Sequence, residues 1–226
     1  MPLDIYDEKD GILINLKKFA YINLPFIIAL LVCVCIIIQY TDKNIISGLI
    51  TIILLQMWSY YSHILGHTNI PLINWHLLHH KPEVSRKPLY VLLEFYINFM
   101  FSGGFILIFY LIAFKQLFNI DFGINNYIVL FWSLVYSTYH LFNYHYLDFD
   151  THDNHHKNDN CNYAPDWMDI MFKTKTNGEH IENMNSSIIN IIVSMLIVVQ
   201  LKGTKYDPIT IISYYINKII RYFYKI

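Results

Sequence analysis

Four apolar runs, each about long enough to cross a bilayer as a helix, constrain the fold of this chain more than any other feature. A helix rises about 1.5 Å per residue and the hydrocarbon core is about 30 Å thick, so a span needs about 20 apolar residues. In lipid, backbone N–H and C=O groups must bond within their own segment, which predicts helices over these runs. The runs cover about residues 19–40, 45–67, 89–114 and 124–145. We therefore expect an all-α integral membrane protein with a four-helix transmembrane bundle made of two hairpins.

The composition agrees with a membrane protein and excludes other classes. Hydrophobic residues make up 55% of the chain, above the roughly 45–50% of a typical soluble domain. The net charge of −1 gives no basic field for nucleic acid. The three cysteines (Cys33, Cys35 and Cys161) form neither a disulfide framework nor a CxxC zinc pattern, and we expect Cys161 to be a small packing residue. No small-residue cleavage site follows the first run, so we expect no cleavable signal peptide.

We interpret the chain, residues 1–226, as a single membrane domain with three parts. Residues 19–145 form the two hairpins, and residues 146–186 are polar and form a helical cap. Residues 187–226 are expected to be membrane-associated helices. Within them, the apolar run 187–201 is about 15 residues long, too short to span comfortably. The tail from 209 to 226 places Lys218, Arg221 and Lys225 at helical spacing, which is typical of an amphipathic helix at the membrane surface.

Two hairpins return the chain to the side where it began, so the histidines between positions 63 and 156 should emerge on one face of the bilayer. Only Lys43 and Lys115 are expected on the opposite face. The positive-inside rule then predicts that the histidine face is cytosolic. The cations expected on the histidine face are Lys17, Lys18, Lys81, Arg86, Lys87, Lys157, Lys173 and Lys175.

Histidines form three clusters on short, regular spacings in this apolar chain. The clusters are His63-x3-His67, His76-x2-His79-His80 and His152-x2-His155-His156. Residues three and four apart share one face of a helix, so each cluster can direct several ring nitrogens at one point. Neutral imidazole is the commonest protein ligand for late first-row metals. The number of rings exceeds what one zinc ion needs and favours two metal ions. His180 is isolated in a polar loop, and we do not expect it to be a ligand.

The spacing also argues against two kinds of metal protein. The sequence His63-Ile64-Leu65-Gly66-His67 lacks the glutamate that a zinc protease places after its first histidine. A metal transporter would place ligands near the bilayer midplane, whereas these histidines lie at predicted helix ends and in polar loops. A polynuclear imidazole site at the membrane surface suits non-haem iron and O₂ activation.

The order of these clusters resembles the fatty acid hydroxylase / sterol desaturase superfamily of membrane di-iron oxygenases. Only eight residues separate His67 from His76, where the related acyl-lipid desaturases carry a long membrane hairpin. The resemblance covers roughly positions 55–175. After the third cluster the family's NYG…D…FGT tail is matched by Asn162-Tyr163-Ala164-Pro165, then Trp167, Asp169 and Phe172-Lys173-Thr174. Ala164 and Lys173 replace glycines of that pattern, and both glycines would serve backbone geometry.

The resemblance implies two iron ions, for which zinc can substitute on purification, and a lipid substrate. It also implies a multi-pass protein of the endoplasmic reticulum that receives electrons from a donor such as cytochrome b5 and its reductase. The implied metal ligands are His63, His67, His76, His79, His80, His140, His145, His152, His155 and His156. Asp153, Asn162 and Asp169 are expected to orient the histidine rings, and Asp148 and Asp150 are near enough in sequence to do so.

Several alternatives stay open from the sequence. A non-catalytic, histidine-rich metal-binding membrane protein would share the clusters, although a degenerate relative would be expected to lose some of these histidines. A plasmalogen-type lipid desaturase would share the chemistry. The sequence does not choose between hydroxylation and desaturation, nor between fatty-acyl, sphingolipid and sterol substrates. Glu94 is unusual within an apolar span, and either faces a cavity in the bundle or lies near the interface.

Overall fold

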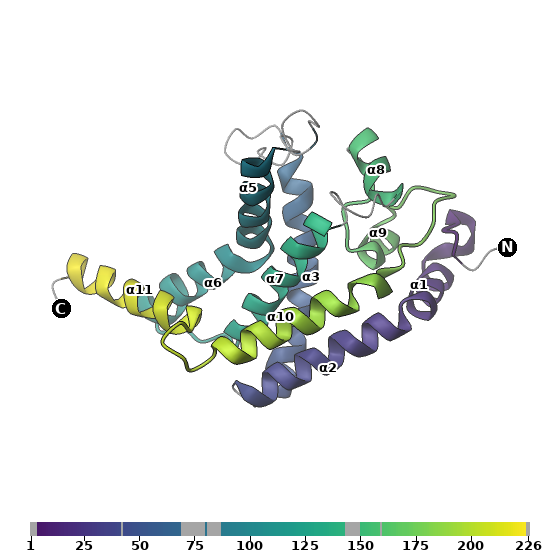
Figure 1. The fold of residues 1–226 in the computed structure, drawn as a ribbon. Helices are drawn as coiled ribbons and strands as arrows, with labels where there is room; N and C mark the ends of the chain where they lie inside the picture. Colours follow the sequence, from purple (N-terminus) through teal and green to yellow (C-terminus); the bar gives the residue numbers. More distant parts are fainter. Residues whose placement is uncertain are drawn as a thin grey trace.

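The computed structural model describes residues 4–41, 43–68, 80, 87–142, 150–158 and 160–224 of the 226-residue chain. Over these residues the chain is helical, and it contains no strand beyond one isolated β-bridge between Ile5 and His180 (Figure 1). The prediction of an all-α fold is confirmed for this part of the chain. The division into one domain with three parts stays a prediction.

Two of the predicted spans form long apolar helices. The second predicted span is α3, Ile45–Gly66. The third is one continuous helix, Pro88–Leu117, which changes between α-helical and π-helical turns along its length. Both are long and apolar enough to cross a membrane. The parts of the longer helix are α5 (Pro88–Phe99), η3 (Met100–Gly104, π-helical), α6 (Phe105–Phe109) and η4 (Tyr110–Leu117, π-helical).

The fourth predicted span is α7, Asn126–Phe142, which packs between α5 and α10 (Ile188–Leu201). A Cβ atom added to Gly103 of η3 would lie 3.0 Å from Val129 Cγ1 and 3.3 Å from the Val129 carbonyl of α7. Glycine therefore permits the close approach of η3 to α7, which is the role that a glycine pair commonly has between membrane helices.

The first predicted span, 19–40, is divided at Asn23. Helix α1 covers Gly11–Ile22 and α2 covers Leu24–Tyr40, and the two are bent by 74°. The Asn23 side chain is buried, donates to the Glu182 carbonyl at 2.9 Å and accepts from the Met184 N–H at 2.7 Å. Because these bonds form at the bend, they fix it to the segment that precedes α10. The expected continuous span was wrong at its N-terminal end, where residues 19–22 belong to α1.

The run 187–201 is longer in the structure than the sequence suggested. The turn η6, Met184–Ser187, continues into α10, and together they form an 18-residue candidate span. At one end Asn185 donates to the Ile22 carbonyl at 2.9 Å, and at the other Lys202 donates to the Thr41 carbonyl at 3.3 Å. Ile22 and Thr41 flank α2, so α10 runs beside α2 along its whole length (Figure 1). The expectation that this run is too short to span is therefore revised.

The two ends of the bundle have different partners. At the end away from the third histidine cluster, Asn125 bonds Thr41 at 3.2 Å and Thr51 at 3.1 Å, and Tyr127 donates to Asp207 at 2.7 Å. At the opposite end, the short helices α8 (Asp150–Lys157) and α9 (Asp166–Phe172) lie to one side of α3 (Figure 1). The candidate site lies between α8 and the end of α3.

The last helix, α11, covers Pro208–Tyr224 and extends away from the bundle, next to η4 (Figure 1). Its exposed side chains include Tyr214, Tyr215 and Ile219. This arrangement is compatible with the predicted amphipathic helix at a membrane surface.

Candidate metal centre

The end of α3 and the helix α8 bring three histidines to one point. His63 lies in the last turn of α3 and His67 is its C-cap residue, so the two rings lie on one face. His155 of α8 meets them from the opposite side. Its Nε2 lies 3.1 Å from His63 Nε2 and 3.0 Å from His67 Nε2. Ligand nitrogens of all three rings lie within 4.8 Å of one another, a grouping that can hold a metal ion.

Backbone carbonyls orient two of these rings. His155 Nδ1 lies 2.6 Å from the Cys161 carbonyl, and His63 Nδ1 bonds the Tyr163 carbonyl. A carbonyl only accepts, so each Nδ1 carries the hydrogen and each Nε2 presents its lone pair. Two lone pairs that face each other at 3.1 Å repel unless a cation lies between them. The donor set therefore fits a metal ion bound through Nε2, and the carbonyls hold the tautomer that such an ion requires.

Two further histidines extend the group. The ring of His80 lies 4.8 Å from that of His67 and 5.0 Å from that of His155. His156 stacks on His80 with ring centroids 4.2 Å apart. His80 of the second cluster and His155 and His156 of the third thus lie next to the first cluster, as two neighbouring metal ions would require.

The imidazoles of His67, His80 and His156 are neutral near pH 7. Burial, together with the nearby His155, lowers the pKa of His67 to about 3. Burial and the neighbouring His156 lower the pKa of His80 to about 3, and burial and His155 lower that of His156 to about 4. Neutral imidazole is the form that binds metal, so protons do not compete for these nitrogens near neutrality.

His140 lies at the edge of the group, on α7. Its ring centroid is 6.3 Å from that of His63, and its Nε2 is 3.5 Å from Glu94 Oε1 on α5. Both side chains are buried. Glu94 therefore faces the interior of the bundle, which answers the question that the sequence left open.

Asp169 organises the loop that supplies the two carbonyls. Its carboxylate accepts from the N–H of Tyr163 at 2.8 Å, from the N–H of Ala164 at 2.7 Å and from the Thr174 hydroxyl at 2.6 Å. Burial raises the pKa of Asp169 to about 7, and the three donors stabilise the ionised form. Thr174 also bonds the Tyr60 hydroxyl of α3 at 3.0 Å. Asp169 thus acts on His63 and His155 through the backbone of residues 161–164.

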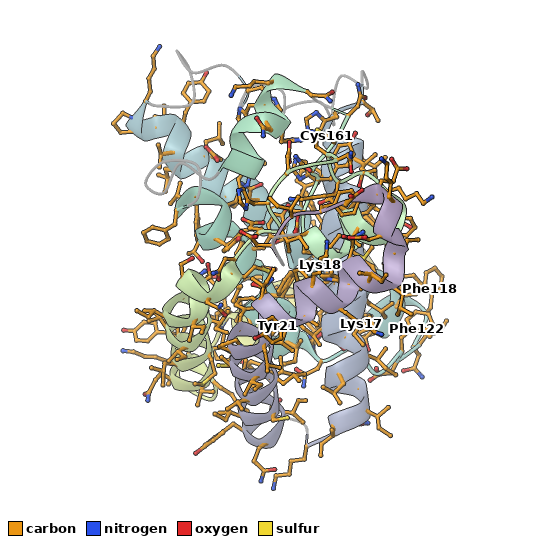
Figure 2. The ribbon with its side chains drawn as sticks, turned by 90° about the vertical axis from the view of Figure 1, so that its right-hand side faces the viewer. Lys17, Lys18, Tyr21, Phe118, Phe122 and Cys161 are labelled. Atoms are coloured by element: carbon orange, nitrogen blue, oxygen red, sulfur yellow. The ribbon has the colours of Figure 1, made fainter. Side chains whose placement is uncertain are left out.

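Asn162 connects the same loop to α8 through Glu179. The Asn162 amide donates to Glu179 Oε2 at 2.8 Å, and the Asn154 amide of α8 donates to Glu179 Oε1 at 2.9 Å. Glu179 lies outside every motif in the sequence, and only the fold reveals its position. Figure 2 shows Cys161, buried in this loop, at the upper end of the molecule, while Lys17, Lys18 and Tyr21 of α1 lie lower.

A buried ion pair joins the first residue of α9, Asp166, to Lys175, which follows Thr174 of the same loop. Lys175 Nζ lies 2.7 Å from Asp166 Oδ1, and the two side chains are 0% and 1% exposed. Burial opposes the charged form of Lys175, but the carboxylates of Asp166, Glu182 and Asp169 together outweigh it and raise the lysine pKa. Lys175 was counted in the sequence as a charge on the membrane surface, and the structure places it inside instead.

The structure brings together part of the predicted ligand set. His63, His67, His80, His140, His155 and His156 lie in one group, whereas His76, His79 and His145 fall outside the described residues. His152 and Asp153 belong to α8, but their side chains are not among those described. His180, which we did not expect to be a ligand, bonds Asp4 at 2.9 Å on the surface. That the described histidines bind metal stays a prediction. No motif in the sequence pointed to the carbonyls of Cys161 and Tyr163 as partners of the histidine rings.

Comparison with known protein families identifies a match. The family model described as fatty acid hydroxylase matches residues 48–174, which include the described histidines of the group and the loop that orients them. Neither the curated proteins nor the solved structures contain a match to this chain.

Proposed function

Because the chain belongs to the fatty acid hydroxylase family, we propose that it is a membrane-bound oxygenase that hydroxylates or desaturates an unactivated C–H bond of a lipid. The observation that carries the proposal is the convergence of three Nε2 atoms, from His63, His67 and His155, at the end of an apolar bundle. Imidazole ligands at that place suit non-haem iron.

We propose that two iron ions are held by the ten predicted histidines, and that bound iron supplies the O₂ activation that side chains lack. In hydroxylation, one C–H bond and the O–O bond break. Two electrons and two protons are consumed, and the products are the alcohol and water. In desaturation, two C–H bonds on adjacent carbons break with the same two electrons and two protons, and the products are an alkene and two waters.

The residues of the chain perform three tasks in this proposal. The carbonyls of Cys161 and Tyr163 keep Nε2 of His155 and His63 directed at the metal. Tyr60, Tyr163 and Met168 form a small apolar cluster beside these histidines, which excludes water from one side. Exposed apolar side chains such as Leu31, Ile53 and Leu92 face outward on the spans and suit contact with lipid.

The two electrons require a donor. We propose a one-electron carrier of the cytochrome b5 type, served by its reductase, which docks on the histidine end of the molecule. This partner fits a histidine face in the cytosol and a protein of the endoplasmic reticulum, as the resemblance implies.

The test compares lipid products from membranes that contain the wild type, His155→Ala or the surface control His180→Ala. We expect oxygen-dependent product from the wild type and from His180→Ala, and none from His155→Ala, with equal membrane insertion of all three. Normal turnover by His155→Ala would overturn the proposal. If purified protein instead binds zinc tightly and consumes no O₂ with lipid and reductant, the chain is a non-catalytic metal-binding protein.

A further inference from the structure

A small polar recess lies beside His63, inside the apolar bundle. It has a volume of about 10 Å³ and lies between α3, the helix Pro88–Leu117 and α7. This is about the room that a single water molecule or one oxygen-sized group needs. Its polar lining includes Ser62, His63, Asn98, Ser102 and Tyr136.

Asn98 is the lining residue that points to a ligand. Its side chain is 6% exposed, it lies within a candidate membrane span, and it is one of the residues that line the recess. A water-sized molecule in the recess still reaches its amide, which forms no hydrogen bond with another described residue. A ligand atom that fills the recess therefore takes the place of water at this amide, and polar residues within spans commonly mark functional sites.

The neighbouring hydroxyl groups have partners of their own. Ser62 donates to the Ser59 carbonyl at 3.0 Å, and Ser102 lies 3.4 Å from the Phe99 carbonyl. Both bonds return to the helix that carries the serine, and neither serine is hydrogen-bonded to Asn98. Asn98 lies one helical turn from Glu94 and one from Ser102, so the three residues form a polar stripe on one side of the helix.

We propose that the recess receives the oxygen atom of a hydroxyl or carbonyl group of the lipid substrate, with Asn98 as its hydrogen-bond donor. This inference rests on the proposed function and narrows its substrate. Because His63 lines the same recess, the bound oxygen lies within a few carbons of the reacting carbon. The substrate is then a lipid that carries a hydroxyl, amide or ester group near the reaction position, and a plain methylene far along an acyl chain is a poor one.

The size of the recess and the chemistry of Asn98 both favour lipids with a hydrogen-bonding oxygen over analogues that lack one. A pocket that holds one hydrogen-bonding group rejects an analogue without it, because the amide then stays buried and unsatisfied. An apolar pocket would distinguish such analogues weakly.

The experiment measures binding independently of turnover. Purified protein in dodecyl maltoside is titrated with 1-hexadecanol or with hexadecane, and the rise in Tm reports affinity. We expect the wild type to bind the alcohol about tenfold more tightly than the alkane, which is the contribution of about one buried hydrogen bond. Asn98→Leu should reduce this ratio to about one, and Asn98→Gln should restore part of it.

Tyr96→Leu is the matched control, because Tyr96 is exposed on the same helix. It should leave the ratio unchanged. Equal binding of alcohol and alkane by the wild type, or an unchanged ratio in Asn98→Leu, would overturn the inference. Lipid turnover by the wild type is measured in parallel. A preserved alcohol preference without any oxygenated product would contradict the proposed function and leave the recess assignment standing.

Discussion

Non-glycine residues of the loop that orients the histidines adopt left-handed backbone conformations. The φ angles are +54° at Asn162, +55° at Ala164 and +57° at Lys173. Ala164 and Lys173 are the positions where the sequence departs from the glycines of the family pattern. Both positions hold the left-handed conformation that glycine adopts without strain, and bonds to Asp169 support it: its carboxylate accepts from the N–H of Ala164 and its carbonyl accepts from the N–H of Thr174. The loop thus retains a glycine-like shape with residues that are strained in it.

Lys173→Gly should stabilise the protein. Lys173 is the C-cap residue of α9, where glycine is the preferred residue. The left-handed conformation costs a non-glycine residue about 1–2 kcal/mol, and glycine loses about 0.5–1 kcal/mol through unfolded-state entropy. We expect a net gain of about 1 kcal/mol, measured as a higher Tm in detergent. Lys173→Ala keeps the strain and serves as the control. A Tm for Lys173→Gly equal to that of Lys173→Ala would contradict this prediction.

Asp169→Asn should weaken metal binding without removing a ligand. The asparagine side chain has one acceptor oxygen and presents an NH₂ group to N–H donors, so the backbone of Tyr163 and Ala164 loses a partner. Changes to groups that orient metal ligands typically cost about 10–100-fold in affinity. Metal content and competition with a chelator would measure the loss. Asp4→Asn, at a surface position next to His180, should bind metal as the wild type does. Wild-type affinity in Asp169→Asn would show that the loop does not need the carboxylate.

At the scale of single elements, the sequence predicted helices where local pattern decides them. Helix α3 follows directly from an uninterrupted apolar run that ends in His63 and His67. The bend at Asn23 does not follow, because the groups that bond Asn23 belong to residues 182 and 184. The extra turn at Met184–Ser187 was missed for a similar reason, since its polar residues give no hydrophobic signal.

The contact between η3 and α7 makes a prediction about Gly103. Gly103→Ala would place a Cβ atom against Ser133 and the Val129 carbonyl, and the carbonyl belongs to a rigid helix. Overpacking of this kind typically costs about 1–3 kcal/mol, which thermal unfolding in detergent would detect. The double variant Gly103→Ala with Ser133→Ala removes the nearest side-chain atom and should recover part of the loss. Additive losses in the double variant would show that the two residues do not compete for space.

At the scale of the whole molecule, the described histidines of the group lie together at one end, as we expected from the sequence, while the two-hairpin topology behind that expectation stays a prediction. The sequence pattern did not indicate that α10 runs beside α2 to the opposite end. Lys202, Lys205 and the cations of α11 follow α10, so they accompany Lys43 and Lys115 away from the histidines. Lys175 is also not a surface cation of the histidine face, because it is buried with Asp166. The charge bias behind a cytosolic histidine face is thus smaller than the sequence suggested, and that orientation stays a proposal.

Cysteine labelling would test this topology. In a background without Cys33, Cys35 and Cys161, the variants Lys157→Cys and Lys205→Cys each carry one thiol at an exposed position. A membrane-impermeant maleimide added to sealed vesicles should label one variant from outside, and the other only after the vesicles are opened. Labelling of both variants from the same side would show that α10 does not cross the bilayer.

The two carbonyls that fix His63 and His155 are main-chain atoms, and no single substitution can delete a main-chain oxygen. Positions 161 and 163 can therefore change residue type during evolution without direct loss of ring orientation, as long as the path of the loop is preserved. Mutational scans that replace one side chain at a time would report only how the buried side chains of Cys161 and Tyr163 pack. The carbonyl groups that act on the two histidine rings would remain invisible in such a scan.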